Sequence, residues 1–188
     1  MMIARPGGDV HVWVCQGPKL ESEDLIARAL AHYREWDAEA HRLHRSANGK
    51  IHVLDRTGAS PFYVNVSRAG DMAICAVACD GPIGADIESL DRADWVAAHK
   101  DLLPSCGGTG RAMLADWVRL EAAHKAAGVG LLEEPSLAAT DPANGAWHLH
   151  QVNVALWKSI CAPLAENYLL GVALAAHGPS ARLRKFCF

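Results

Sequence analysis

The chain has 188 residues and a formal net charge of −3, and 51% of its residues are hydrophobic while 21% are charged. A chain of this length and composition can bury a sizeable core, so general disorder is not expected. The small negative charge argues against nucleic acid or an anionic membrane as a partner of the whole molecule. No apolar run reaches the roughly 18 residues that a membrane-spanning helix needs.

The N-terminal segment and the cysteines indicate the cytoplasm as the compartment. Residues 1–8 contain no apolar core of signal-peptide length. The six cysteines are scattered without a Cys-x-x-Cys pair, so free thiols are expected and neither zinc nor a disulfide framework is predicted. His148 and His150 can share a strand face, but no third ligand lies nearby, which favours surface positions.

The first quarter of the chain predicts a strand, a helix and a second strand. Residues 10–15 alternate as in a strand. Ser22 is placed to cap a helix with two acids in its first turn, and apolar residues at helical spacing extend this prediction to about Arg45. A turn at residues 48–50 then precedes a short strand at 51–54.

The segment 62–88 carries the most informative pattern. Two apolar strands are expected around a turn at 69–71, and a second turn at 80–82 leads into Gly84-Ala-Asp86-Ile-Glu88. Side chains alternate along a strand, so Asp86 and Glu88 project to the same side, about 6–7 Å apart. Such a pair suits Mg²⁺, although two solvated acids at a strand end give the same pattern.

The second half predicts helices followed by strands. A short helix is expected at 92–101, a flexible glycine-rich breaker at 104–110 and the clearest helix of the chain at 111–127. Within that helix Trp117, Glu121 and Lys125 lie on one face; an exposed Glu-Lys pair beside a core tryptophan is the simpler alternative. Strands are expected at 146–154, 156–162 and 168–176, with a closing segment at 181–188.

A short internal repeat suggests a duplicated architecture. Residues 76–82 and 173–179 match at four of seven positions, and each ends an apolar strand. We therefore expect an α+β fold built as a pseudo-dimer of two similar halves, residues 1–88 and 89–188, each a small mainly antiparallel sheet with a packed helix. The second copy has Leu183 and Lys185 opposite the two acids, so one site is expected. An internal pseudo-dimer has less need of a partner subunit, so a monomer is expected.

Three ordered motifs resemble a known family. They are Asn65-Val-Ser67-Arg-Ala-Gly70, Gly84-Ala-Asp86-Ile-Glu88 and Trp117-Val-Arg-Leu-Glu121-Ala-Ala-His-Lys125. Together they resemble the surfactin-type 4′-phosphopantetheinyl transferases, whose pattern runs Asn-x-Ser-His-Ser-Gly, Gly-x-Asp-x-Glu and Trp-x-x-Lys-Glu-[Ala/Ser]-x-x-Lys. Order and spacing agree over residues 48–131, where Gly49-Lys50 and Gly128-Val-Gly-Leu131 resemble two further turns of the family.

The resemblance implies transfer of the phosphopantetheine arm of coenzyme A to a serine of an acyl or peptidyl carrier protein, with release of 3′,5′-ADP. It also implies two α/β halves with the site at their junction. Attack on a pyrophosphate needs its charge neutralised, which Mg²⁺ provides. The expected site comprises metal ligands Asp86, Glu88 and Glu121, catalytic residues Glu121 (the candidate base) and Lys125, and coenzyme A-binding residues Lys50, Ser67 and Arg68.

Two departures from the family pattern affect the expected charge of the site. Leu120 and Val129 stand where the family carries lysines, which removes positive charge near a highly anionic substrate. We therefore expect weaker coenzyme A binding than in an enzyme with the full motif. The alternative hypothesis is a catalytically weak homologue that binds coenzyme A or a carrier protein without efficient transfer. The motifs identify neither the carrier nor its pathway.

Overall fold

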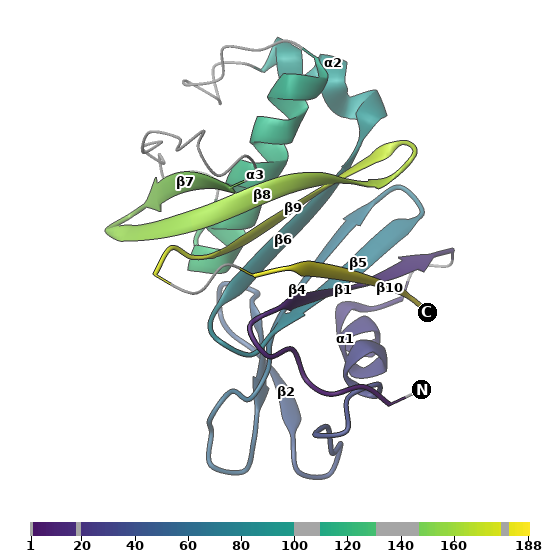
Figure 1. The fold of residues 1–188 in the computed structure, drawn as a ribbon, viewed down its shortest axis with the longest axis vertical. Helices are drawn as coiled ribbons and strands as arrows, with labels where there is room; N and C mark the ends of the chain where they lie inside the picture. Colours follow the sequence, from purple (N-terminus) through teal and green to yellow (C-terminus); the bar gives the residue numbers. More distant parts are fainter. Residues whose placement is uncertain (1, 18–19, 100–109, 131–146, 178–180) are drawn as a thin grey trace.

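The computed structural model describes residues 2–17, 20–99, 110–130, 147–177 and 181–188, and within them the chain is an α+β protein (Figure 1). The strands are β1 (Val10–Gln16), β2 (Arg42–Arg45), β3 (Ile51–Leu54), β4 (Tyr63–Ala69), β5 (Met72–Ala78), β6 (Ile83–Ser89), β7 (Trp147–Val152), β8 (Ala155–Ala165), β9 (Tyr168–Ala175) and β10 (Leu183–Cys187). The helices are α1 (Ser22–Leu30), the 3₁₀ turn η1 (Leu90–Arg92), α2 (Ala93–Ala98) and α3 (Arg111–Ala127).

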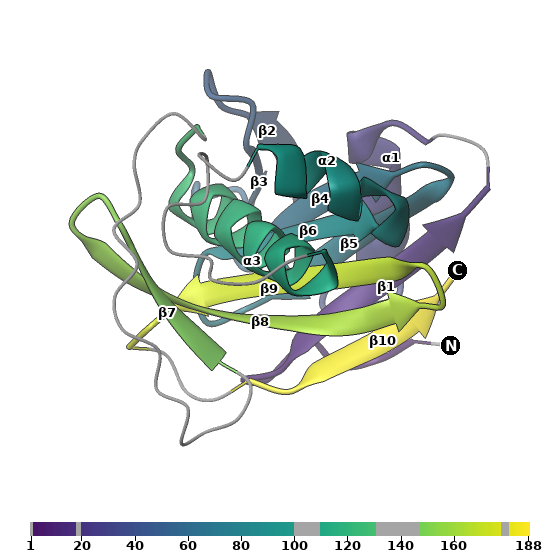
Figure 2. The ribbon, with the colours of Figure 1, turned by 90° about the horizontal axis from the view of Figure 1, so that it is seen from above.

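Two four-stranded sheets and two helices form four layers. The first sheet has the order β10-β1-β5-β4 and the second the order β6-β9-β8-β7, and every pairing except β1 with β10 is antiparallel. Helix α1 packs on the outer face of the first sheet, and α3 packs on the outer face of the second (Figures 1 and 2). A separate hairpin, β2–β3, lies beyond the first sheet.

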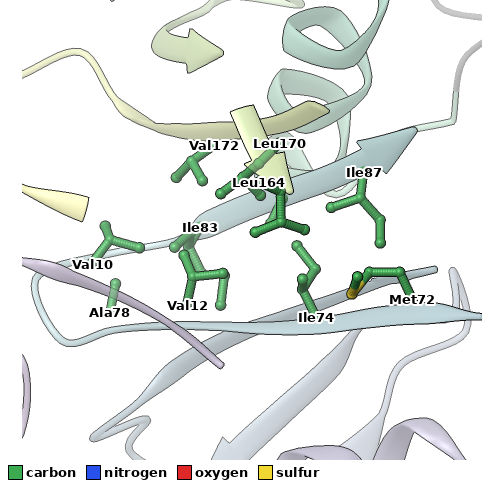
Figure 3. Close-up of a cluster of buried hydrophobic side chains, with 12 residues drawn as sticks. Val10, Val12, Met72, Ile74, Ala78, Ile83, Ile87, Leu164, Leu170 and Val172 are labelled. Atoms are coloured by element: carbon green, nitrogen blue, oxygen red, sulfur yellow. The ribbon is translucent and has the colours of Figure 1, made fainter. Parts of the chain in front are cut away.

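The core between the sheets is built from alternating strand residues. One face of β6 contributes Ile83, Ala85 and Ile87, which meet apolar side chains of β1 and β5 across the interface (Figure 3). Burying one face of each strand in this way is what period-2 alternation predicts. The opposite face of β6 is thereby turned towards α3.

Two strands cross between the sheets. β6, in the predicted first half, pairs with β9 of the second sheet, whereas β10, in the predicted second half, pairs with β1 of the first sheet. The repeat makes β6 equivalent to β10 and β5 equivalent to β9, yet β6 pairs directly with β9, whereas β1 separates β10 from β5. The strand orders of the two sheets therefore differ, and the pseudo-dimer and the boundary at 88/89 stay predictions.

Most predicted elements are confirmed, but the first helix is much shorter than expected. α1 ends at Leu30, and residues 42–45 form β2 rather than the end of a helix. The reason is tertiary pairing: the backbone at His32 and Arg34 hydrogen-bonds to Ile3, and β2 pairs with β3 in antiparallel register. Ser22 is the first helical residue, with Glu21 as the N-cap.

The second half follows the prediction more closely. α3 spans residues 111–127 and ends at Gly128, whose φ of 73° is the left-handed conformation that glycine adopts readily. Where a helix was predicted at 92–101, η1 ends at Arg92 and α2 follows it, and residues 100–101 lie outside the described residues. Residues 104–109 of the predicted breaker lie outside the described residues. None of the helices described is both long and apolar enough to cross a membrane.

Candidate functional site

The two motif acids of β6 lie on the strand face that meets α3. Asp86 is 4% exposed and contacts Lys125 of α3, whereas the intervening Ile87 belongs to the core between the sheets. The expectation that Asp86 and Glu88 project to the same side of one strand is therefore supported by the alternation of β6.

Gly84, the first residue of the same motif, lets α3 approach β6 closely. A Cβ at this position would lie 1.9 Å from the carbonyl oxygen of Ala122 and 2.3 Å from the amide nitrogen of Ala126. Any larger side chain would therefore push the helix away from the strand. Because the helix carries Glu121 and Lys125, Gly84 sets the distance between the two motif segments.

Ser67, Asp86 and Lys125 form a closed triangle of hydrogen bonds. Lys125 Nζ lies 2.6 Å from Asp86 Oδ1 and donates to Ser67 Oγ at 3.1 Å, while Ser67 Oγ donates to Asp86 Oδ1 at 2.8 Å. The three residues come from β4, β6 and α3. The structure thus brings one residue from each sequence motif to a single point.

The Asn-x-Ser segment joins β4 to β6 without strand pairing. Asn65 Oδ1 accepts a hydrogen bond from the Ala85 amide at 2.9 Å, and Ser67 Oγ accepts one from the Ile87 amide at 3.3 Å. Alternate side chains of one strand thus satisfy alternate backbone groups of the other. The sequence motif did not predict this role for Asn65.

Glu88 has a cationic partner that sequence reasoning missed. Arg92 Nη1 lies 2.6 Å from Glu88 Oε1, and the guanidinium carbon lies 4.4 Å from the centroid of the Trp95 ring. The spacing of four residues does not predict this contact, because Glu88 lies in a strand, one residue before its end, and Arg92 ends a 3₁₀ turn. Burial, followed by the charge of Asp86, raises the pKa of Glu88.

Glu121 lies one helical turn before Lys125 and responds electrostatically to the β6 acids. Burial, followed by the nearby charge of Asp86, raises the pKa of Glu121 to about 7, whereas the charge of Lys125 opposes the shift. A carboxyl group with a pKa near neutrality can accept a proton at physiological pH. This property suits the expected base.

The expected Mg²⁺ needs hard oxygen donors, which the three motif acids carry. Asp86 Oδ2 is buried and has no hydrogen-bond partner among the residues that the structure describes, and the crowded acids Glu88 and Glu121 both have raised pKa values. A divalent cation would satisfy the oxygen and offset the repulsion, so these donors fit Mg²⁺. Across the described ranges, no three His, Cys, Asp or Glu side chains are already gathered as metal ligands. Metal binding therefore stays a prediction.

Lys50 lies at the end of α3. Its Nζ donates to the carbonyl oxygens of Lys125 at 3.0 Å and Ala126 at 2.8 Å, and the side chain of neighbouring Asn48 donates to the Gly128 carbonyl at 2.6 Å. These bonds satisfy carbonyls that a helix end leaves open. Lys50 is thus brought next to α3, the helix that carries Glu121 and Lys125, with its amine already engaged.

The side chain of Arg68 lies on the opposite face of β4 from the side chain of Ser67. Side chains alternate along β4, and the Arg68 guanidinium turns to the α1 side, where Nη1 donates to Ser22 Oγ at 3.0 Å and Nη2 to the Leu20 carbonyl at 2.6 Å. There Arg68 lines a pocket of about 210 Å³ beside the turn at Gly70. A role of Arg68 at coenzyme A stays a prediction, at a place apart from the acids.

Leu120 and Val129, which stand where the family pattern has lysines, both pack against apolar side chains. Leu120 is buried in a cluster with Val96, Leu114 and Leu169, on a different side of α3 from Glu121. Val129 packs against the small apolar cluster at the end of α3. Replacing either residue affects the core as well as the charge of the site.

One histidine prediction is wrong. His150 is buried, not a surface residue, because its face of β7 packs towards α3, and its Nε2 lies 2.6 Å from Ser159 Oγ. Burial lowers the pKa of His150 to about 4. The five cysteines within the described ranges are free thiols, as expected.

Comparison of the sequence with models of known protein families finds no match, and a search of curated proteins finds none either. The family assignment therefore stays a prediction carried by the three motifs.

Proposed function

We propose that this protein is a Mg²⁺-dependent 4′-phosphopantetheinyl transferase that moves the phosphopantetheine arm of coenzyme A to a serine of an acyl or peptidyl carrier protein. The observation that carries the proposal is the contact of Ser67, Asp86 and Lys125, which join three motifs distant in sequence. The raised pKa of Glu121 beside this contact supports the assignment of a base.

In the proposed reaction the carrier serine oxygen attacks the β-phosphorus of the coenzyme A pyrophosphate. A new phosphorus–oxygen bond forms to the serine, the bond to the bridging oxygen breaks, and 3′,5′-ADP leaves with the bonding electron pair. The serine proton passes to the carboxylate of Glu121. Lys125, whose side chain is 31% exposed, is placed to stabilise negative charge on the phosphates.

Asp86, Glu88 and Glu121 would hold the cation. When bound, Mg²⁺ would neutralise the pyrophosphate charge. The chain itself supplies a buried carboxylate in Asp86, a proton acceptor in Glu121 and a cation in Lys125. Arg92, bonded to Glu88, adds a second cation at the edge of this group.

The test is the intact mass of a panel of acyl and peptidyl carrier proteins after incubation with the protein, coenzyme A and Mg²⁺. A gain equal to one phosphopantetheine arm is expected on at least one carrier, and Glu121→Ala should abolish it. A matched control is Glu166→Ala, at an exposed position between β8 and β9. No gain on any carrier would contradict the proposal.

A second candidate, a weak homologue that binds without efficient transfer, is favoured by the distribution of cations. Lys50 Nζ is held by helix carbonyls, Arg68 faces α1, and Leu120 is buried among apolar residues. Fewer positive charges are then directed to an anionic substrate than in the family pattern. Binding of coenzyme A with no mass gain on any carrier would select this candidate.

A further inference from the structure

We infer that Ser67 is a positioning residue that holds the Asp86 carboxylate and leaves its second oxygen for a divalent cation, rather than a direct ligand of coenzyme A. The inference deepens the proposed function and rests on it for the identity of the cation. It replaces the role that the sequence motif alone assigns to this serine.

The hydrogen-bonding capacity of Ser67 is fully used inside the protein. A hydroxyl group has one donor and two acceptor positions. The donor goes to Asp86 Oδ1 at 2.8 Å, and the two acceptor positions receive Lys125 Nζ at 3.1 Å and the Ile87 amide at 3.3 Å. A phosphate oxygen could bind Ser67 Oγ only by displacing one of these partners.

Burial leads to the same conclusion. Ser67 is 6% exposed, because this residue of β4 packs against β6 and α3. Asp86, its main partner, is also buried. A buried hydroxyl bonded to a carboxylate orients that carboxylate, as the outer partners of metal ligands do.

The two carboxylate oxygens of Asp86 have different hydrogen-bond environments. Oδ1 accepts from both Ser67 and Lys125, while Oδ2 is buried and has no hydrogen-bond partner within the described part of the chain. Because both bonds hold Oδ1, the carboxylate cannot rotate freely. Oδ2 is thereby the oxygen presented for a cation, which suits a hard ion such as Mg²⁺.

Asn65 completes the arrangement one step along the strand. Its side chain binds the Ala85 amide, and Ser67 binds the Ile87 amide, so the backbone on both sides of Asp86 is attached to β4. β4 belongs to the first sheet and β6 to the second. The first sheet therefore sets the position of an acid that belongs to the second.

The experiment compares Ser67→Ala, Ser67→Thr and the wild type in two binding measurements. Mg²⁺ affinity is measured without coenzyme A by the dependence of the melting temperature on Mg²⁺ concentration. Coenzyme A affinity is measured calorimetrically in EDTA. Ser60→Ala is the control, since the Ser60 hydroxyl bonds only to the Phe62 carbonyl of its own loop among the contacts described.

We expect Ser67→Ala to weaken Mg²⁺ binding by roughly 10-fold or more, as loss of a carboxylate's outer partner commonly does. Coenzyme A affinity in EDTA should be unchanged, and Ser67→Thr, which keeps the hydroxyl, should restore Mg²⁺ affinity. A fall in metal-free coenzyme A affinity in Ser67→Ala overturns the inference, whatever happens to Mg²⁺. Unchanged Mg²⁺ affinity in Ser67→Ala, or no Mg²⁺ effect on the wild type, also overturns it.

The two proposals fail in distinguishable ways. If no carrier gains mass with the wild type, the transferase proposal fails, and the Mg²⁺ measurements still decide the role of Ser67. If carriers are modified but Ser67→Ala binds Mg²⁺ as the wild type does, only the positioning role fails.

Discussion

Lys125 Nζ and Asp86 Oδ1 lie 2.6 Å apart and join the end of α3 to the middle of β6. The acid is almost fully buried, whereas the lysine side chain remains 31% exposed. A buried charge whose partner is removed is costly, so this pair contributes to the fold as well as to the site.

A double-mutant cycle measures the strength of this pair. We expect Lys125→Met to destabilise the protein by about 1–3 kcal/mol, less than for a fully buried pair because the lysine is partly solvated. In the Asp86→Asn background the same substitution should cost much less, since no charge is left unpaired. Urea unfolding of the four proteins gives the coupling energy. A coupling energy close to zero would show that solvent already screens the pair.

Glu121→Gln should change how stability depends on pH. The pKa of Glu121 rises from an ordinary 4.5 in the unfolded chain to about 7 in the folded protein, so the folded state binds more protons between these values. The contribution of Glu121 to the free energy of unfolding is therefore fully present below pH 4.5 and is lost as the pH rises to 7. The free energy of unfolding of Glu121→Gln should exceed that of the wild type by on the order of 1–3 kcal/mol at pH 8, and by little at pH 4.5.

The check on Glu121 is chemical denaturation across this pH range without metal. Glu166→Gln, at an exposed position, serves as the matched substitution. If Glu121→Gln and the wild type kept the same difference in unfolding free energy at all pH values, Glu121 would titrate normally.

Gly84→Ala should destabilise the protein and displace α3 from β6. The added Cβ would lie 1.9 Å from the Ala122 carbonyl oxygen, a backbone atom that cannot rotate away. We expect a loss of about 1–3 kcal/mol or more, as for overpacked cores, together with weaker Mg²⁺ binding. Gly7→Ala is the control, because within the described residues, its two chain neighbours apart, no heavy atom would lie within 4 Å of the added Cβ. Equal melting temperatures for the two variants would contradict the close approach of α3.

His150 predicts a second pH effect with the opposite sign. The pKa of His150 falls from an ordinary 6.5 to about 4 because the imidazole is buried. The unfolded chain therefore takes up a proton before the folded protein does, and stability is lost as pH falls from 6.5 to 4. His150→Gln should flatten this loss, which can reach about 3 kcal/mol. The pH profile of the melting temperature is the measurement, and His177→Gln, at an exposed position, serves as the matched substitution.

Local patterns were sufficient for α3 and for the described strands other than β2, and insufficient where distant segments compete. The alternation of β6 and the glycine after α3 are visible in the sequence and are confirmed. The end of α1 was not predictable from helical spacing, because pairing with Ile3 and between β2 and β3 ends the helix. Tertiary contacts override propensity at such positions.

The same distinction applies to the site. Motif spacing correctly brought Ser67, Asp86 and Lys125 together, since each lies in an element that local patterns identify. It missed Arg92, which meets Glu88 only because the chain turns from β6 into η1. It also grouped Arg68 with Ser67, although neighbouring residues of a strand face opposite sides.

The crossing of β6 and β10 bears on how the protein folds. A cut between residues 88 and 89 would give two fragments, each carrying a strand that completes the other's sheet. Neither fragment could then close its own core, so two separately expressed fragments should be unstructured alone and assemble only when mixed. For the same reason the intact chain should unfold in a single cooperative transition, with both sheets lost together.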